Sequence, residues 1–180
     1  MSGFLRFVGI VNAAIWFGGG LIFTLIILPG VFSQDVHTLF GEEEKYKYYA
    51  GGVAMVLFGR FFVLQYICGV IALLHLFAEK LYLGRAISAL SLAIVVGALF
   101  ISLIGGGVVQ PHLRDFRQTM YSLKASADEK AFATHSFGVW HGLSEAANLF
   151  MLAGLLAHLM RVSRPEEPGR YGTLFPKFRG

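Results

Sequence analysis

The sequence has few charged residues, one cysteine and no familiar catalytic motif. Charged residues make up 14% of its 180 residues and hydrophobic residues 56%, a composition too apolar for a soluble domain. The single cysteine, Cys68, excludes an internal disulfide and a cysteine-only metal site. We find no Ser-His-Asp, phosphate-loop or nicotinamide-type pattern. A membrane protein without catalysis is therefore expected rather than an enzyme.

Long polar segments are also missing, so there is no room for a second, water-soluble core. The first apolar run is longer than the roughly 7 to 15 residue core of a signal peptide and has no small-residue cleavage site before Pro29. We therefore expect a membrane span here and not a secretory signal peptide. No basic and aromatic pattern indicates nucleic acid. We expect the lipid bilayer as a partner and no nucleic acid.

Four apolar segments are each long enough to cross the bilayer, which takes about 20 helical residues. Because backbone groups in lipid must pair internally, each segment should be helical. The sequence therefore predicts an all-α integral membrane four-helix bundle over residues 1–163, followed by a basic tail containing Pro and Gly over residues 164–180. The predicted spans are about residues 4–32, 51–77, 86–109 and 131–160.

We call the side of the membrane opposite the termini the outer side. The second outer connection, residues 112–130, and the start of the fourth span carry local signals. Leu113, Phe116 and Met120 recur at helical spacing, which predicts a short amphipathic helix on the membrane surface. Ser126 followed by Glu129 is a capping box. The fourth helix should therefore begin near residue 127.

Four spans place both termini on one side of the membrane. That side carries eight Lys and Arg residues and the opposite side six, and cytoplasmic segments collect such cations. We therefore expect cytoplasmic termini, in the cytoplasmic (inner) membrane of a bacterium.

Polar residues share one stripe of the fourth span. At 100° per residue, His141, Ser144, Glu145 and Asn148 fall on one narrow face of an otherwise apolar helix. Such a face should meet protein or a water-filled cavity. Gly138 and Gly142 beside it are spaced as in helix-packing GxxxG motifs.

Arg60 lies at nearly the same depth in the second span as His141 in the fourth. An unpaired charge there costs at least about 2.5 to 3.5 kcal/mol. We therefore hypothesise a buried polar cluster in which Arg60 pairs with Glu145 beside His141. The cluster is either a structural clamp or a proton or ligand site, and both interpretations stay open.

Three histidines lie at the outer ends of their segments. His37, His112 and His135 could gather a copper or zinc ion with help from Asp35 or Asp115. No compact spacing such as HxxxH accompanies them, and interfacial histidines are commonly just hydrated.

Two further histidines, His75 and His158, lie near the inner ends of the second and fourth spans. Imidazoles at equal depth on different helices can ligate a b-type haem or a transition metal. His158 points about 100° away from the polar stripe, so simple hydration is the alternative here too.

Three sequence motifs resemble a known family. The fourth span reads FGVWHGLSEAANLF, the first ends in FTLIILPGVFSQDVHTLFG, and QPHLRDFRQTM follows the third. Together they are spread across most of residues 4–160 and resemble the transmembrane protein 205-like family, also called domain of unknown function 4149, within the broader copper-resistance-protein-D-like group. The resemblance implies a four-helix membrane bundle, no settled reaction, and a family site at His141, Ser144 and Asn148. Relatives in the broader group include a haem-carrying membrane protoporphyrinogen oxidase and proposed copper transporters.

Three functions follow as expectations. The first is an accessory subunit without catalysis, packed into a larger membrane complex. The second is a redox or export protein that binds haem b or a transition metal such as copper. The third is a small transporter whose cluster of Arg60, His141 and Glu145 relays protons.

Overall fold

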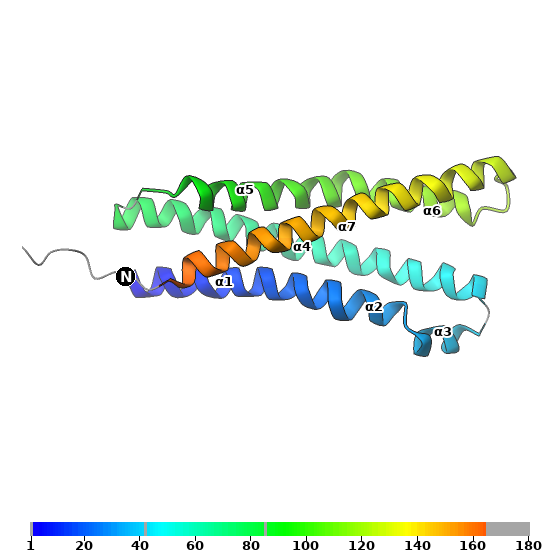
Figure 1. Cartoon of the computed structure of the whole chain (residues 1–180), viewed down its shortest axis with the longest axis horizontal. Helices are drawn as coiled ribbons and strands as arrows, with labels where there is room; N and C mark the ends of the chain where they lie inside the picture. The colour runs from blue at the N-terminus through cyan, green and yellow to red at the C-terminus, as the bar shows by residue number, and fades with distance from the viewer. Residues whose placement is uncertain (1, 42, 85, 165–180) are drawn as a thin grey trace, which may run out of the picture.

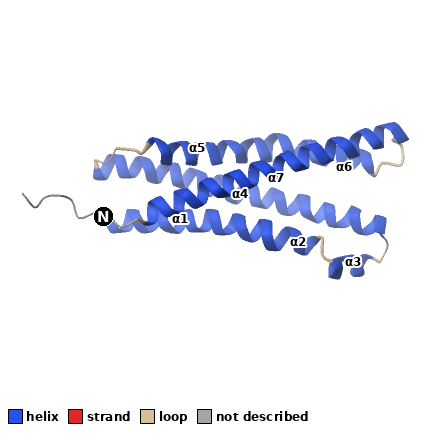
Figure 2. Ribbon diagram, viewed as in Figure 1, coloured by secondary structure: helices blue, strands red, loops and turns tan. Residues whose placement is uncertain are grey.

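The computed structural model describes residues 2–41, 43–84 and 86–164. Within these ranges the chain is helical and has no strand. Four helical rods, each long and apolar enough to cross a membrane, run side by side along the long axis of the molecule (Figures 1 and 2). The predicted all-α four-helix membrane bundle is confirmed, and the chain is an integral membrane protein. The rods are Gly3–Phe40, Lys45–Leu83, Ala89–Met120 and Ala127–Ser163.

Two of the rods are interrupted by short π-helical segments, and the other two are single helices. The elements in chain order are α1 (Ser2–Ile22), η1 (Phe23–Ile27), α2 (Leu28–Val31), α3 (Gln34–Phe40), α4 (Glu43–Leu83), α5 (Ala89–Ile104), η2 (Gly105–Val109), α6 (Gln110–Met120) and α7 (Ala127–Ser163).

Both π segments end two residues before a proline. η1 precedes Pro29 and η2 precedes Pro111. Proline has no N–H to donate, and its ring clashes with the carbonyl four residues earlier in an α-helix. A π turn widens the helix at this place, so each rod continues past its proline.

The second outer connection is helical, as predicted, but it does not form a separate surface helix. α6 continues α5 through η2 and packs along α7 (Figure 1). Leu113 of α6 is buried. Pro111 falls in the first turn of α6, where a missing N–H costs little, so the helix is not broken there.

The four rods pack as a square. α1 packs against α4 and α7, and α5 packs against the same two helices, so α4 and α7 occupy diagonal corners. Residues from all four helices form the core, including Trp16, Cys68, Val95 and Leu155. This arrangement decides which polar side chains can meet.

Polar side chains in the core pair between helices. Asn12 Nδ2 of α1 donates to the Cys68 carbonyl of α4 at 2.9 Å, and Trp16 Nε1 donates to Gln65 Oε1. Trp16 and Gln65 are both fully buried. These bonds join α1 to α4 near the centre of the bundle.

The capping box at the start of α7 is confirmed. Ser126 Oγ accepts from the Glu129 N–H at 3.3 Å, and Glu129 Oε2 accepts from the Ser126 N–H at 2.7 Å. Ser126 has extended backbone angles, and the helix begins at the next residue. α7 thus starts where the sequence predicts.

The two ends of the described chain meet. Arg6 Nη2 donates to the carbonyls of Ser163 and Arg164 at 3.1 and 3.2 Å, and Figure 1 shows the start of α1 beside the end of α7. The predicted tail, apart from Arg164, lies outside the described residues.

Candidate functional site

The outer half of the α7 stripe faces away from the bundle. His141 Nε2 lies 3.1 Å from Glu145 Oε1, one turn along the helix. Their side chains are 43% and 66% exposed, and the Phe137 ring stacks on the His141 ring. A histidine and carboxylate pair thus lies on the bundle surface, not in a buried cluster.

The inner part of the stripe contacts the first rod. Asn148 Nδ2 donates to Thr24 Oγ1 at 2.9 Å, and Thr24 belongs to the π segment η1. Ser144 Oγ instead donates to the His141 carbonyl of its own helix at 2.7 Å. Of the predicted stripe, Asn148 is therefore the residue that joins α7 to another helix.

Arg60 does not join this stripe. It is exposed on α4, and its side chain makes no hydrogen bond or ion pair with any described residue. It lies five residues before the buried Gln65, about 140° around the helix. The hypothesised ion pair between Arg60 and Glu145 is absent from the described residues.

The reason is that depth alone does not bring two residues together. Counted from the outer ends of their helices, Arg60 is 17 residues into α4 and Glu145 is 18 residues into α7. At 1.5 Å per residue these are about 26 and 27 Å along the two helices. The depths match, but α1 and α5 pack between α4 and α7.

The glycine pair beside the stripe is open. A Cβ atom built on Gly138 or Gly142 would meet nothing within 4 Å. By contrast, a Cβ on Gly20 of α1 would lie 2.7 Å from Leu152 Cδ2 of α7. The GxxxG face of α7 is therefore not used for packing among the described residues.

The three outer histidines are not brought together. His37 Nε2 lies 2.7 Å from Glu43 Oε2, whereas His112 Nδ1 hydrogen bonds the Val108 carbonyl at 2.8 Å and its ring stacks on Trp140. His135 is exposed on α7. No group of three or more His, Cys, Asp or Glu side chains able to hold a metal exists among the residues described.

Their places in the fold explain this separation. α3, with His37, packs on α4, while α6, with His112, packs on α7. The carboxylate beside His37, that of Glu43, links α3 to the start of α4. Hydrogen bonds from the Lys47 ammonium, the larger effect, and from His37 hold the pKa of the Glu43 carboxyl below its usual value.

The two inner histidines are both buried. His75 Nε2 hydrogen bonds the Leu5 carbonyl at 2.9 Å, and its ring fills the space left by Gly9. The cavity at this end of the bundle, of about 180 Å³, is lined by neither of these histidines.

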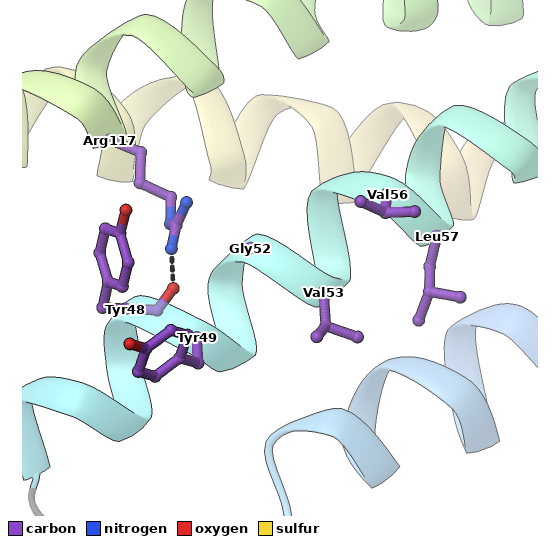
Figure 3. A pocket seen from close by; sticks show the side chains of 7 residues that line it. All are labelled: Tyr48, Tyr49, Gly52, Val53, Val56, Leu57 and Arg117. Atoms are coloured by element: carbon purple, nitrogen blue, oxygen red, sulfur yellow. Dashed lines mark hydrogen bonds between the residues drawn. The ribbon is translucent and has the colours of Figure 1, made fainter. Parts of the chain in front are cut away.

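Sequence reasoning missed an apolar cavity near the outer end of α4. It holds about 400 Å³ and opens beside Arg117, whose guanidinium donates to the Tyr48 carbonyl and lies 5.1 Å from the Tyr48 ring centroid (Figure 3). A Cβ on Gly51 would lie 2.7 Å from Arg117 Nε. The glycine pair after the tyrosines was the available signal, since it admits a side chain from α6.

Sequence reasoning also missed a set of arginine contacts at the inner end. Arg161 Nε donates to Ser91 Oγ at 3.1 Å, and its Nη2 donates to Ser88 Oγ at 2.7 Å. Arg6 of α1 also donates to the carbonyls at the end of α7. Together these bonds join the first, third and fourth rods. No spacing rule connects these residues, because they lie far apart in the sequence.

Comparison with known proteins identifies a family. A family model described as a domain of unknown function (DUF4149) matches residues 11–122, which reach from α1 beyond the end of α6. The His141 motif of α7 lies outside the matched range. No curated protein and no solved structure matches the chain.

Proposed function

The chain belongs to the DUF4149 family of unknown function, and we propose that it is a subunit without catalysis in a larger membrane assembly. One observation carries this proposal: Arg60 and Glu145 are both exposed deep within membrane-spanning helices. A charged side chain facing acyl chains costs at least about 2.5 to 3.5 kcal/mol. A neighbouring protein would cover these groups and offer them polar partners.

The open glycine face of α7 supports the same proposal. Helices associate closely in lipid where glycines let their backbones approach. Gly138 and Gly142 lie within one turn of His141 and have no neighbour over their α-carbons. A partner helix seated there would also cover the His141–Glu145 pair.

A glycine substitution tests the proposal. Gly142→Leu should break the assembly, because the new side chain fills the space a partner helix needs. Gly97→Leu on α5 is the matched control, since a Cβ there also meets nothing within 4 Å. The readout is the mass of the native complex after extraction in mild detergent, with its partner chains identified by mass spectrometry.

We expect wild type and Gly97→Leu to travel with the same partners, and Gly142→Leu to lose them while keeping its own thermal stability. A wild-type chain that migrates as a lone monomer in every mild detergent would refute the proposal. So would equal retention of partners by both variants.

Finer parts of this proposal rest on the sequence. We also propose that the protein lies in the inner membrane of a bacterium. The excess of Lys and Arg on the side of the termini supports cytoplasmic termini.

Proton-coupled transport is a second candidate, favoured by the 3.1 Å contact between His141 and Glu145 in the middle of α7. Ionisable pairs inside a membrane commonly relay protons. Flux lost in Glu145→Gln would favour it, and a Soret band in the purified protein would instead favour haem binding.

A further inference from the structure

We propose that the inner end of the bundle binds a phosphate oxyanion through Arg6, Arg161 and Arg164. These three side chains line the cavity of about 180 Å³ between the ends of α1, α4, α5 and α7. The proposal is independent of the assembly proposed above, because it concerns the opposite end of α7 from the open glycine face.

Two of the guanidinium groups are fixed by the fold. Arg161 donates from Nη2 to Ser88 and from Nε to Ser91. Arg6 donates from Nη2 to the two carbonyls at the end of α7. Each guanidinium has five N–H donors. Both therefore keep donors for a ligand while their positions are set in advance.

One of these donors lacks an acceptor. Arg6 Nε is buried and makes no hydrogen bond within the described part of the chain. A buried donor without an acceptor is unfavourable. An oxyanion in the cavity would supply the missing acceptor.

The charge of the cavity favours an anion. Among the described residues, its lining carries three arginines against one carboxylate, Glu79, which lies 3.9 Å from His75 Nε2. The planar fork of a guanidinium matches the oxygens of phosphate and binds them in pairs. Ser91 adds a hydroxyl to the lining.

The cavity lies where lipid headgroups would reach it. It is formed at the ends of the membrane-spanning helices, beside both termini of the described chain. A phospholipid phosphate and free inorganic phosphate offer the same oxygens, so the experiment uses both. Anionic lipids gather at the cytoplasmic leaflet, which is the expected side of this cavity.

Binding to the full-length protein tests the site. Delipidated protein in detergent is titrated with phosphatidylglycerol, followed by native mass spectrometry, and with inorganic phosphate, followed by calorimetry. The variants are Arg6→Gln, Arg164→Gln and the pair, with Arg60→Gln as control because Arg60 is an exposed arginine far from the cavity. Each lost charged contact should weaken binding about tenfold.

The two arms identify the source of the phosphate. If the double substitution weakens binding of inorganic phosphate, the ligand is a free anion. If it weakens only binding of phosphatidylglycerol, the ligand is a lipid headgroup. Arg164 makes no side-chain hydrogen bond with described residues, so Arg164→Gln decides the matter if Arg6→Gln fails to fold. The proposal is wrong if wild type binds neither ligand, or if Arg164→Gln and Arg60→Gln bind equally well.

Discussion

At the scale of single residues, the bundle fits large side chains against glycines on the facing helix. The His75 ring lies over Gly9, and Leu99 lies over Gly69. Added atoms at such places push into a packed neighbour, whereas Gly3 and Gly18 of α1 meet no described neighbour within 4 Å. The glycines of this chain thus divide into packing positions and open ones, which their sequence context does not distinguish.

Gly9→Ala should destabilise the protein. The new Cβ would lie 2.5 Å from Cε1 and Nε2 of His75, and the ring is held in place by the Leu5 carbonyl. Overpacking of this kind costs about 1 to 3 kcal/mol. Reversible unfolding in mixed detergent micelles measures the difference from wild type.

Gly18→Ala is the control for this measurement. It changes the same helix in the same way, but its Cβ meets nothing within 4 Å. Equal stability of the two variants would contradict the packing seen around His75.

At the scale of helices, the sequence predicts four apolar rods but not how they face each other. The presence of four rods follows from four long apolar segments, and the start of α7 follows from Ser126 and Glu129. The hypothesised ion pair between Arg60 and Glu145 is not formed among the described residues. Counting residues gives the depth of a side chain along its helix, whereas contact also depends on which helices are neighbours. The order of rods around the square is a property of the whole packing and is not written in any one segment.

The continuation of α5 into α6 illustrates a second limit. The sequence predicts a third span that ends at residue 109, just before Pro111, and a separate surface helix after it. Three consecutive glycines before Pro111, Gly105 to Gly107, form the π turn that carries the rod onward. Phe62 and Tyr66 of α4 pack close against Gly105 and Gly106, so tertiary contacts fix this local shape.

Ser126→Ala should loosen the first turn of α7. The substitution removes the hydroxyl that accepts from the Glu129 N–H, and losing such a cap costs about 0.5 to 2 kcal/mol. Hydrogen exchange of the amides in the first turn should become faster. Ser136→Ala in the same helix is the control, because Ser136 makes no side-chain hydrogen bond within the described residues. Equally slow exchange in both variants would contradict the capping role.

At the scale of the whole molecule, the bundle has two unlike ends. One end carries the outer connections with their tyrosines and the α3 contact through Glu43. The other gathers the guanidinium groups of Arg6 and Arg161 and the end of α7. The expected orientation in the membrane rests on this difference in charge.

Cysteine labelling tests that orientation. In intact cells, a membrane-impermeant maleimide should label Ser122→Cys in the outer connection, and Ser163→Cys only after the membrane is permeabilised. Cys68 is 2% exposed, so the native thiol should give little background and need not be removed. The opposite labelling pattern would reverse the assigned sides.

The hydrogen bonds from Arg6 to the end of α7 have a consequence for how the chain could be cut and rejoined. Since the first residues of α1 and the last residues of α7 are neighbours, a short linker from residue 164 to residue 2 could close this part of the polypeptide into a circle. New termini opened between Tyr121 and Ser126 would then emerge on the far side of the membrane, with every rod still beside its present neighbours. The order in which the rods are synthesised is therefore separable from the way they are arranged.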